Sequence, residues 1–295
     1  PEDVLRDADT AMHQAKRAGR SAVKVFDQKM RVHAVDRMRL ESDLRRAVDA
    51  QQFLLYYQPI VNLETGCIDA FEALLRWQHP ERGLVAPSSF IPVVEETGLI
   101  VPIGWWVLRS ACAQAALWQQ QHPDFSELAI SVNVSPRQFS DPHKLAEGVL
   151  KILEETGLPA RSLKLEITES ALMEHMDKTC EALKRLQEHG VKVSIDDFGT
   201  GYSSLSYLHS LEFDVLKIDR SFVCRMDAGK RPKIVETILD LSRSLGMSVT
   251  AEGVETADQL AQLRGLRCET AQGYFFSRPI PEDAVSEMLS RPPAW

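Results

Sequence analysis

Short segments in which apolar and polar residues alternate recur along the chain from Phe53 to its end. A period of two residues is typical of a β-strand that shows two different faces. We therefore predict eight strands, over residues 53–57, 67–75, 128–134, 163–168, 191–196, 214–218, 247–252 and 270–274.

Between the later strands, apolar residues recur at helical spacing, which predicts helices over residues 144–156, 176–190, 232–246 and 256–266. Alternating strands and helices imply parallel strands joined by crossover helices, and eight such strands imply an α/β fold, the (β/α)8 TIM-like barrel. Only residues 59–66 separate the first two strands, which is too short for a parallel crossover. The barrel is therefore expected to be modified, with an antiparallel first strand.

The first 50 residues carry a different pattern. Residues 1–27 predict a helix followed by a short strand, a piece too small to bury its own core. Residues 28–50 are rich in charge and predict a further helix, although their first ten or so residues would also fit a solvated linker. The expected organisation is an N-terminal piece over 1–27, a linker helix over 28–40 and the barrel domain over 41–295.

Composition narrows the function classes. The chain has 295 residues, 44% hydrophobic and 26% charged, with no apolar run approaching the length of a membrane span. Its five cysteines never form a Cys-x-x-Cys pair, which favours reduced thiols in the cytoplasm and argues against zinc. A net charge of -8 disfavours nucleic-acid binding, so an anionic substrate would need local positive charge such as bound metal.

Polar residues occupy the ends of most predicted strands, and a barrel brings those ends together at one mouth. Burying one ionised group without a partner costs several kcal/mol, so the set as a whole indicates a functional site. Taken singly, Asn133 could be a structural hydrogen-bond partner and Lys217 half of a buried ion pair. The set comprises Glu72, Asn133, Glu166, Asp196, Asp197, Lys217, Glu252 and Gln272.

Asp196 and Asp197 pose a geometric problem, because adjacent residues of a regular strand point to opposite faces. They can share a site only if the chain leaves the strand between them. We expect the strand to end at Asp196, residues 198–201 to form a glycine-rich turn, and Ser203 and Ser204 to cap a following helix. The alternative is a loop tip with solvated aspartates.

The donor types identify the class of ion. Carboxylates and one amide, without thiolate or imidazole, suit Mg²⁺ or Mn²⁺, and two such ions about 3.5–4 Å apart would suit hydrolysis of a phosphodiester. No Ser-His-Asp or Cys-His set occurs among the strand ends, so a metal-activated water is the expected nucleophile. Lys217 would position or deprotonate that water or offset phosphate charge, and Glu252 would bind metal or accept a proton. Arg76 could bind a substrate phosphate or form a surface ion pair.

Several ordered motifs lie at these positions. The chain from about Arg39 to its end thereby resembles the EAL domain family, the cyclic di-GMP phosphodiesterases. The motifs are Glu72-Ala73-Leu74, Ser131-Val132-Asn133-Val134-Ser135, Glu166-Ile167-Thr168-Glu169, Asp196-Asp197-Phe198-Gly199-Thr200-Gly201, Lys217-Ile218-Asp219, Ala251-Glu252-Gly253-Val254-Glu255 and Gln272-Gly273-Tyr274.

The resemblance implies two Mg²⁺ or Mn²⁺ ions and hydrolysis of cyclic di-GMP to linear pGpG, which lowers this second messenger in bacterial signalling. No quoted position departs from the motifs, so an active enzyme is expected. By the same resemblance Glu169 braces the glycine loop. The implied metal ligands are Glu72, Asn133, Glu166, Asp196, Asp197 and Glu252, the catalytic residues Lys217, Glu252 and Glu169, and the substrate-binding residues Gln58, Leu75, Arg76, Asp219, Glu255 and Gln272.

The resemblance also implies partners. A homodimer contact would involve the loop over residues 196–205 and the helix after it, although the apolar residues there fit a core equally well. Residues 7–20, with 26–27, resemble the end of a GGDEF (diguanylate cyclase) domain, without that family's signature loop, so no cyclase activity is expected here. The simpler interpretation of this N-terminal piece is an amphipathic arm. An upstream GGDEF domain and sensor domains are therefore expected, and a membrane anchor in upstream segments stays open.

Two other functions fit the same motifs. One is a cyclic di-GMP receptor without turnover, which the intact set of metal ligands argues against. The other is an enzyme for a different phosphodiester, which the sequence leaves open.

Overall fold

The computed structural model describes residues 12, 26–169, 172, 176–199, 213–226 and 232–295. The chain forms two compact units, a smaller one of Pro1–Phe53 with Trp77–Leu99 and a larger one of Leu54–Arg76 with Ile100–Trp295. The predicted helix and strand over 1–27 lie almost wholly outside the described residues. The predicted cap at Ser203 and Ser204, and the helix of the predicted dimer contact, also lie outside them.

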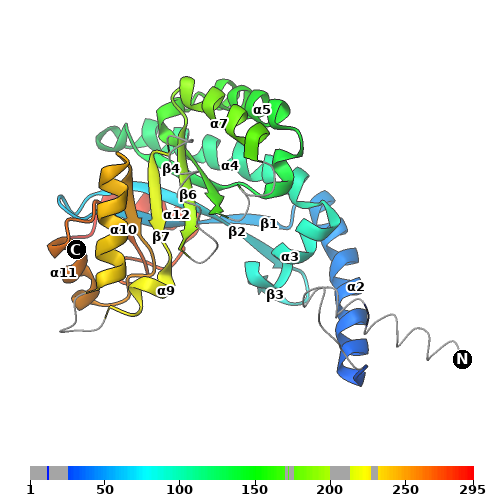
Figure 1. The fold of residues 1–295 in the computed structure, drawn as a ribbon. Coiled ribbons are helices and arrows are strands. Elements are labelled where there is room, and N and C mark those ends of the chain that lie inside the picture. Colours follow the sequence, from blue (N-terminus) through cyan, green and yellow to red (C-terminus); the bar gives the residue numbers. More distant parts are fainter. Residues whose placement is uncertain (1–11, 13–25, 170–171, 173–175, 200–212, 227–231) are drawn as a thin grey trace, which may run out of the picture. The chain divides into compact units, whose positions relative to one another are not determined.

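A closed sheet of eight strands forms the centre of the larger unit (Figure 1). Seven of these strands run parallel to one another. The first strand, β1, closes the barrel by pairing with β2 and with β9. Its pairing with β9 is antiparallel and places Ile60 opposite Gln272. The predicted barrel with an antiparallel first strand is therefore confirmed. The strands are β1 (Phe53–Asn62), β2 (Ile68–His79), β4 (Ala129–Asn133), β5 (Leu163–Thr168), β6 (Lys192–Phe198), β7 (Val215–Ile218), β8 (Ser248–Ala251) and β9 (Thr270–Gln272).

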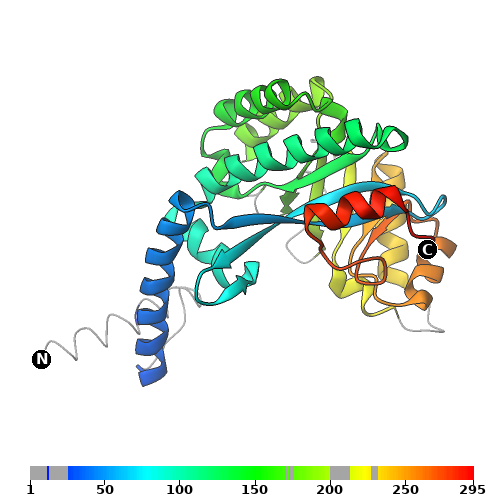
Figure 2. The same cartoon turned by 180° about the vertical axis from the view of Figure 1, so that it is seen from behind.

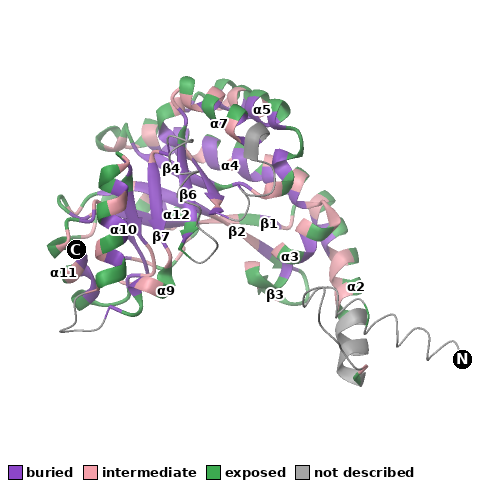
Figure 3. Cartoon of the chain, in the orientation of Figure 1, coloured by how far each residue is buried: buried purple, intermediate pink, exposed green. Residues whose placement is uncertain are grey.

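Helices surround these strands, and exposed residues lie on their outward faces (Figure 3). In α10, for example, Val235, Ile238, Leu239 and Ser242 are buried, at helical spacing, and the helix packs against β7 and β8. Figure 2 shows α12 beside β1 at the C-terminal end of the chain. The helices are α4 (Ile100–Gln121), α5 (Pro142–Thr156), α7 (Met176–Glu188), α9 (Arg220–Val223), α10 (Lys233–Ser244), α11 (Ala257–Gly265) and α12 (Glu282–Ser290), with 3-10 turns η1 (Pro123–Phe125), η2 (Pro136–Ser140) and η3 (Ala160–Ser162).

The long helix α4 is the most apolar helix described. By length and composition alone it could cross a membrane, since its most apolar 18-residue window has a mean hydropathy of 1.2. Half of that window is buried within the protein. The helix packs on β4 and α5, and Trp118 donates a hydrogen bond from Nε1 to Ser286 Oγ of α12 at 3.2 Å. These contacts are those of a core helix.

The smaller unit contains α2 (Gln28–Asp49), β3 (Gly83–Val85) and α3 (Pro87–Thr97), with the last three residues of β2. Its core includes the aromatic rings of Phe53, Trp77 and Phe90, whose centroids lie 5.8–6.3 Å apart. Helix α2 agrees with the helix predicted over residues 28–50, and it continues past residue 40, where the linker was expected to end.

Several segments differ from the prediction. Strand β1 continues to Asn62 rather than ending at Tyr57, because Ile60, Val61 and Asn62 pair with β9. Pro59, which was expected in the turn, lies inside the strand. The elements over residues 83–121 were not predicted at all. The apolar residues of α4 cover more than one face of the helix, so its sequence shows little helical periodicity.

Candidate metal centre and active site

The ammonium of Lys217, on β7, lies among four carboxylates that come from β2, β5, β6 and the residue directly after β8. Its Nζ is 2.6 Å from both Glu166 Oε2 and Glu252 Oε1, 3.4 Å from Asp196 Oδ1 and 3.6 Å from Glu72 Oε2. The Lys217 side chain is only 1% exposed. The parallel strands thus bring together five of the residues that the sequence placed at strand ends.

The charges in this cluster do not balance, because one ammonium faces four carboxyl groups. Burial alone would lower the pKa of Lys217, but the carboxylates raise it well above its usual value. Burial and neighbouring carboxylates raise the pKa of Glu166 well above its ordinary range and that of Glu252 to about 8. A bound cation would lower these pKa values and so favour release of protons from the cluster.

Glu72 is the exception within the cluster. Burial would raise its pKa, but the charge of Lys217 and hydrogen bonds from two side-chain amides together lower it. Asn133 Nδ2 donates to Glu72 Oε1 at 2.7 Å, and Gln272 Nε2 donates to Oε2 at 2.7 Å and to Gln58 Oε1 at 2.9 Å. Glu72 therefore stays ionised and fixed in orientation.

A β-bulge brings Asp196 and Asp197 to the same site. Ile195 pairs with Leu216 and Phe198 with Ile218, so two residues of β6 lie opposite Lys217 alone. Asp197 has a φ of 55°, in the left-handed region that aspartate tolerates better than most residues. The chain therefore turns at Asp197 within β6, and the expectation that the strand ends at Asp196 was wrong.

Glu169, just beyond β5, contacts the residue that follows this bulged strand. Its Oε2 accepts a hydrogen bond from the backbone N–H of Gly199 at 3.3 Å. Its Oε1 is buried and has no hydrogen-bond partner in the described part of the chain. Gly199 has a φ of 91°, a conformation that favours glycine.

The acidic residues fit a cation. Ligand oxygens of Asp196, Asp197 and Glu252 lie within 4.8 Å of one another, so this cluster could hold a metal ion. All donors are hard oxygen atoms, of the kind that Mg²⁺ and Mn²⁺ prefer. Burial and the charge of Asp196 raise the pKa of Asp197, as expected for a carboxyl group that lacks sufficient positive charge nearby.

A cavity of about 250 Å³ opens beside these carboxylates. Among the predicted site residues, the following line it: Gln58, Glu72, Asp196, Glu252, Glu255 and Gln272. Leu74 lines the cavity and Leu75 does not, because alternate residues of β2 share a face and Leu74 shares that of Glu72.

Two predicted substrate residues point to other contacts. Arg76 places its guanidinium 5.5 Å from the centre of the Tyr56 ring, and its Nη1 donates to the Leu75 carbonyl oxygen at 2.9 Å. Asp219 caps α9, with its Oδ1 accepting from the Ser221 N–H at 3.0 Å. Neither residue lines the cavity.

The sequence prediction missed Arg220, which lines the cavity and forms a 3.0 Å ion pair with Glu255. Two glycines beside predicted site residues are the feature of the sequence that could have indicated this close packing. A Cβ on Gly253 would lie 2.3 Å from Arg220 Cγ, and one on Gly273 would lie 2.1 Å from the Val254 carbonyl oxygen. Both glycines are therefore needed for close packing around the cavity.

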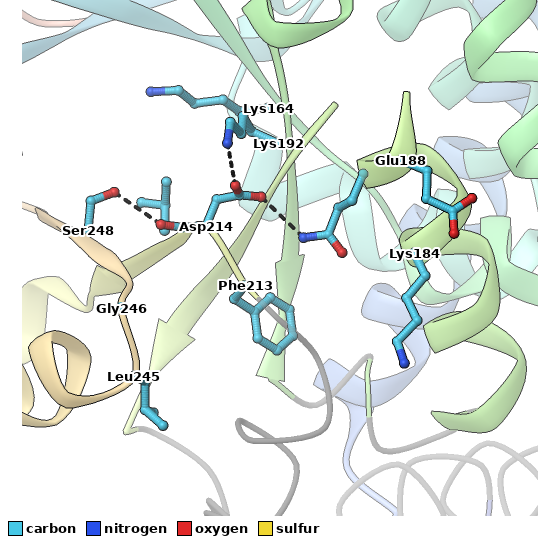
Figure 4. Close-up of a pocket in the computed structure, with 11 residues that line it drawn as sticks. Lys164, Lys184, Glu188, Lys192, Phe213, Asp214, Leu245, Gly246 and Ser248 are labelled. Carbon is cyan, nitrogen blue, oxygen red and sulfur yellow. Dashed lines mark hydrogen bonds and ion pairs between the residues drawn. The ribbon is translucent and has the colours of Figure 1, made fainter. Parts of the chain in front are cut away.

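A larger hollow of about 1010 Å³ lies at the opposite ends of β6–β8 and holds none of the predicted site residues (Figure 4). Its walls carry Lys164 and Lys192, but Lys192 Nζ is 2.6 Å from Asp214 Oδ1. Burial lowers the pKa of Lys164, although Asp69 and Asp214 oppose this effect. Positive charge in this hollow is therefore offset by nearby carboxylates.

We expect the metal-free protein to lose stability as the pH rises from about 4.5 to about 8. The folded state raises the pKa of Glu252 from 4.5 to about 8, so it binds this proton more tightly than the unfolded chain does. The resulting stabilisation is complete below the unfolded pKa and is lost as the pH passes the folded one. Thermal unfolding in chelator should show this slope, and Glu252→Gln should flatten it. An equal slope in the variant would contradict the assignment.

Comparisons with known proteins agree with this site. A family model described as the EAL domain matches residues 41–279. The cyclic di-GMP phosphodiesterase NbdA of Pseudomonas aeruginosa is 43% identical over 98% of this chain and 36% of its own length. The bifunctional diguanylate cyclase/cyclic di-GMP phosphodiesterase MucR of the same organism is 42% identical over 96% of this chain and 41% of its own length.

Solved structures show the same similarity. The PaMucR phosphodiesterase in complex with c-di-GMP has a TM-score of 0.79 and 42% identity, covering 84% of this chain and 99% of that one. The FimX EAL domain of Xanthomonas citri, also with c-di-GMP, has a TM-score of 0.75 and 25% identity, covering 85% and 97%. The chain spans between a third and a half of the length of the curated relatives named above. On the family match and these similarities, the chain belongs to the EAL domain family.

Proposed function

We propose that this chain is a metal-dependent phosphodiesterase that hydrolyses cyclic di-GMP to linear pGpG. The observation that carries the proposal is the convergence of strand-end carboxylates around Lys217, beside a cavity of about 250 Å³. Relatives named for this activity, and a relative solved with c-di-GMP, support the choice of substrate.

The charge of the cavity supports a requirement for metal. Its walls carry Glu72, Asp196, Glu252 and Glu255, whereas Arg220, which is itself paired with Glu255, is the one cation among the described residues that line it. A phosphodiester is an anion, so these walls would repel it unless bound cations reversed the local charge. The residues that would hold two ions of Mg²⁺ or Mn²⁺ are Glu72, Asn133, Glu166, Asp196, Asp197 and Glu252.

When bound, such ions lower the pKa of water and stabilise charge on the phosphoryl oxygens. The protein contributes the orientation of this machinery and a route for protons. Glu252, directly after β8, would bind metal or accept a proton during the reaction. Lys217 Nζ can orient water or offset phosphate charge, while Gln58 and Gln272 fix the cavity wall by their mutual hydrogen bond. We also propose that three residues that do not line the cavity contact the substrate: Leu75, Arg76 and Asp219.

The deciding experiment incubates the purified chain with cyclic di-GMP and Mg²⁺ or Mn²⁺ and separates the products by chromatography. The expected product is pGpG, with none in excess chelator. Intact cyclic di-GMP recovered after demonstrable binding would favour a receptor without turnover. Faster hydrolysis of another cyclic dinucleotide under the same conditions would change the substrate and keep the enzyme class.

The whole protein extends this proposal. We propose a linker helix over 28–40 and an enzyme domain over 41–295, preceded by a GGDEF domain of which 1–27 is the end, together with upstream sensor domains. The relatives' greater length supports additional domains, and MucR carries the name of a cyclase as well as a phosphodiesterase. We also propose a cytoplasmic location and a homodimer through the helix after the 196–205 loop. Sedimentation of the purified chain would test the dimer.

A further inference from the structure

Lys217 contacts most of the residues proposed to bind metal, and it does so across the barrel rather than locally. Its four carboxylate neighbours are Glu72 on β2, Glu166 on β5, Asp196 on β6 and Glu252 directly after β8. Of the six proposed ligands, these are four. The same ammonium therefore compensates charge that the metal ions would otherwise compensate.

The two shortest contacts are made by carboxylates that are themselves proposed metal ligands. Glu166 Oε2 and Glu252 Oε1 each lie 2.6 Å from Lys217 Nζ, the distance of a short charge-assisted hydrogen bond. A lone pair that accepts such a hydrogen bond is not available to a cation at the same time. Lys217 and metal thus draw on the same two carboxylates and the same negative charge.

The backbone gives this ammonium a fixed origin. Strand β7 has four residues and pairs on both sides, with Lys217 opposite Thr250 of β8 and next to residues that pair with β6. Separation of the ammonium from Glu166 and Glu252 would therefore come from rotation of side chains rather than from movement of β7. A long, unbranched side chain with four torsions allows such a rotation.

We propose that Lys217 is an internal counter-cation, which holds the ligand carboxylates together while metal is absent and releases Glu166 and Glu252 when metal binds. This inference rests on the proposed function of the site as a metal centre. It assigns Lys217 a positioning role in addition to any contact with substrate. It also explains why this acidic cluster can fold before metal arrives, since four buried carboxylates without a cation would be strongly destabilising.

The test compares the wild type with Lys217→Met, a neutral side chain of similar length, by calorimetric titration with Mn²⁺ and by thermal unfolding. We expect the metal-free variant to unfold at a lower temperature, and its Kd for Mn²⁺ to fall about tenfold because the competing cation is gone. Its thermal stabilisation by saturating Mn²⁺ should exceed that of the wild type. An unchanged or weaker Mn²⁺ affinity would overturn the inference. One of those two results is expected if Lys217 only stabilises the fold or only takes part in the reaction.

The matched control is Lys192→Met, which removes a 2.6 Å ion pair with Asp214 at the other end of β6. It should leave the Mn²⁺ affinity unchanged. A tenfold gain in this control as well would reduce the effect to net charge and overturn the inference. Absence of Mn²⁺ binding by the wild type would remove the proposed metal centre itself, a result distinct from binding that Lys217→Met fails to tighten.

A measurement on the wild type covers the case in which Lys217→Met folds only with metal. In protein labelled with ¹⁵N at the lysine Nζ, the Lys217 signal, assigned by its loss in Lys217→Arg, should shift as Mg²⁺ is added. The shift should saturate with the Mg²⁺ affinity found by calorimetry. A Lys217 signal that does not respond while Mg²⁺ binds would contradict release of the carboxylates.

Discussion

Asp196→Asn is expected to reduce kcat/KM for cyclic di-GMP by about 10³-fold, equivalent to about 4 kcal/mol of transition-state stabilisation. The Asp196 carboxylate lies 3.4 Å from Lys217 Nζ and belongs to the cluster that could hold metal with Asp197 and Glu252. Its Oδ1 also accepts from the Asp197 N–H at 2.9 Å, which an amide oxygen can still do. The variant should therefore keep its backbone while losing a charged ligand.

Initial rates and calorimetric titration with Mn²⁺ measure the two effects together. Metal-free thermal stability should be equal to or above that of the wild type, because one of four mutually repelling carboxylates has been neutralised. The control is Asp214→Asn, whose carboxylate instead binds Lys192 and the Val193 N–H at the opposite ends of the strands. That variant should lose stability and keep its Mn²⁺ affinity. If Asp196→Asn binds Mn²⁺ as tightly as the wild type does, Asp196 is not a metal ligand.

Glu169→Ala is expected to reduce activity by about 10- to 100-fold, the range typical of residues that orient metal ligands. Its Oε2 accepts from the Gly199 N–H, two residues beyond Asp197. Without that contact the bulged segment has more conformations available, and metal must select the correct one. Raised Mg²⁺ should therefore restore part of the activity, because binding to the ordered form shifts the population toward it.

Two comparisons separate bracing from direct ligation. Glu169→Gln keeps an oxygen that can accept from Gly199 and should retain more activity than the alanine variant. Glu166→Ala removes a carboxylate that contacts Lys217 at 2.6 Å and should resist rescue by Mg²⁺. Identical responses of Glu169→Ala and Glu166→Ala across a metal titration would rule out the bracing role.

The sequence predicted the barrel because its signal is repeated. Alternation in short strands, helical spacing between them and a connection too short for a crossover each depend on local periodicity. Helix α4 and the elements β3 and α3 of the smaller unit lacked that signal. In α4, buried residues such as Ile100, Val107 and Trp118 share one face, but the exposed apolar residues Trp106 and Leu117 lie outside it and obscure the helical periodicity of the sequence.

The site was predictable in composition and less so in geometry. Strand-end position was enough to bring Glu72, Glu166, Lys217 and Glu252 together, because parallel strands end at a common edge. The bulge at Asp197 was not visible, since a preference of aspartate for positive φ is weak beside the strand preference of the residues around it. Arg220 was missed because it reaches the cavity by packing against Gly253, which follows a different strand. The spacing of residues along the sequence does not show such a contact.

The pairing of the first strand with the last has a consequence for how the protein folds. Gln272 donates to Gln58, 214 residues earlier, and to Glu72, 200 residues earlier. Contacts of such sequence separation form late, because the chain must first lose the entropy of closing a long loop. During synthesis the cluster around Glu72 thus stays incomplete until β9 is available. Metal uptake by a refolding chain should accordingly coincide with the slowest step, closure of the barrel, and report it directly.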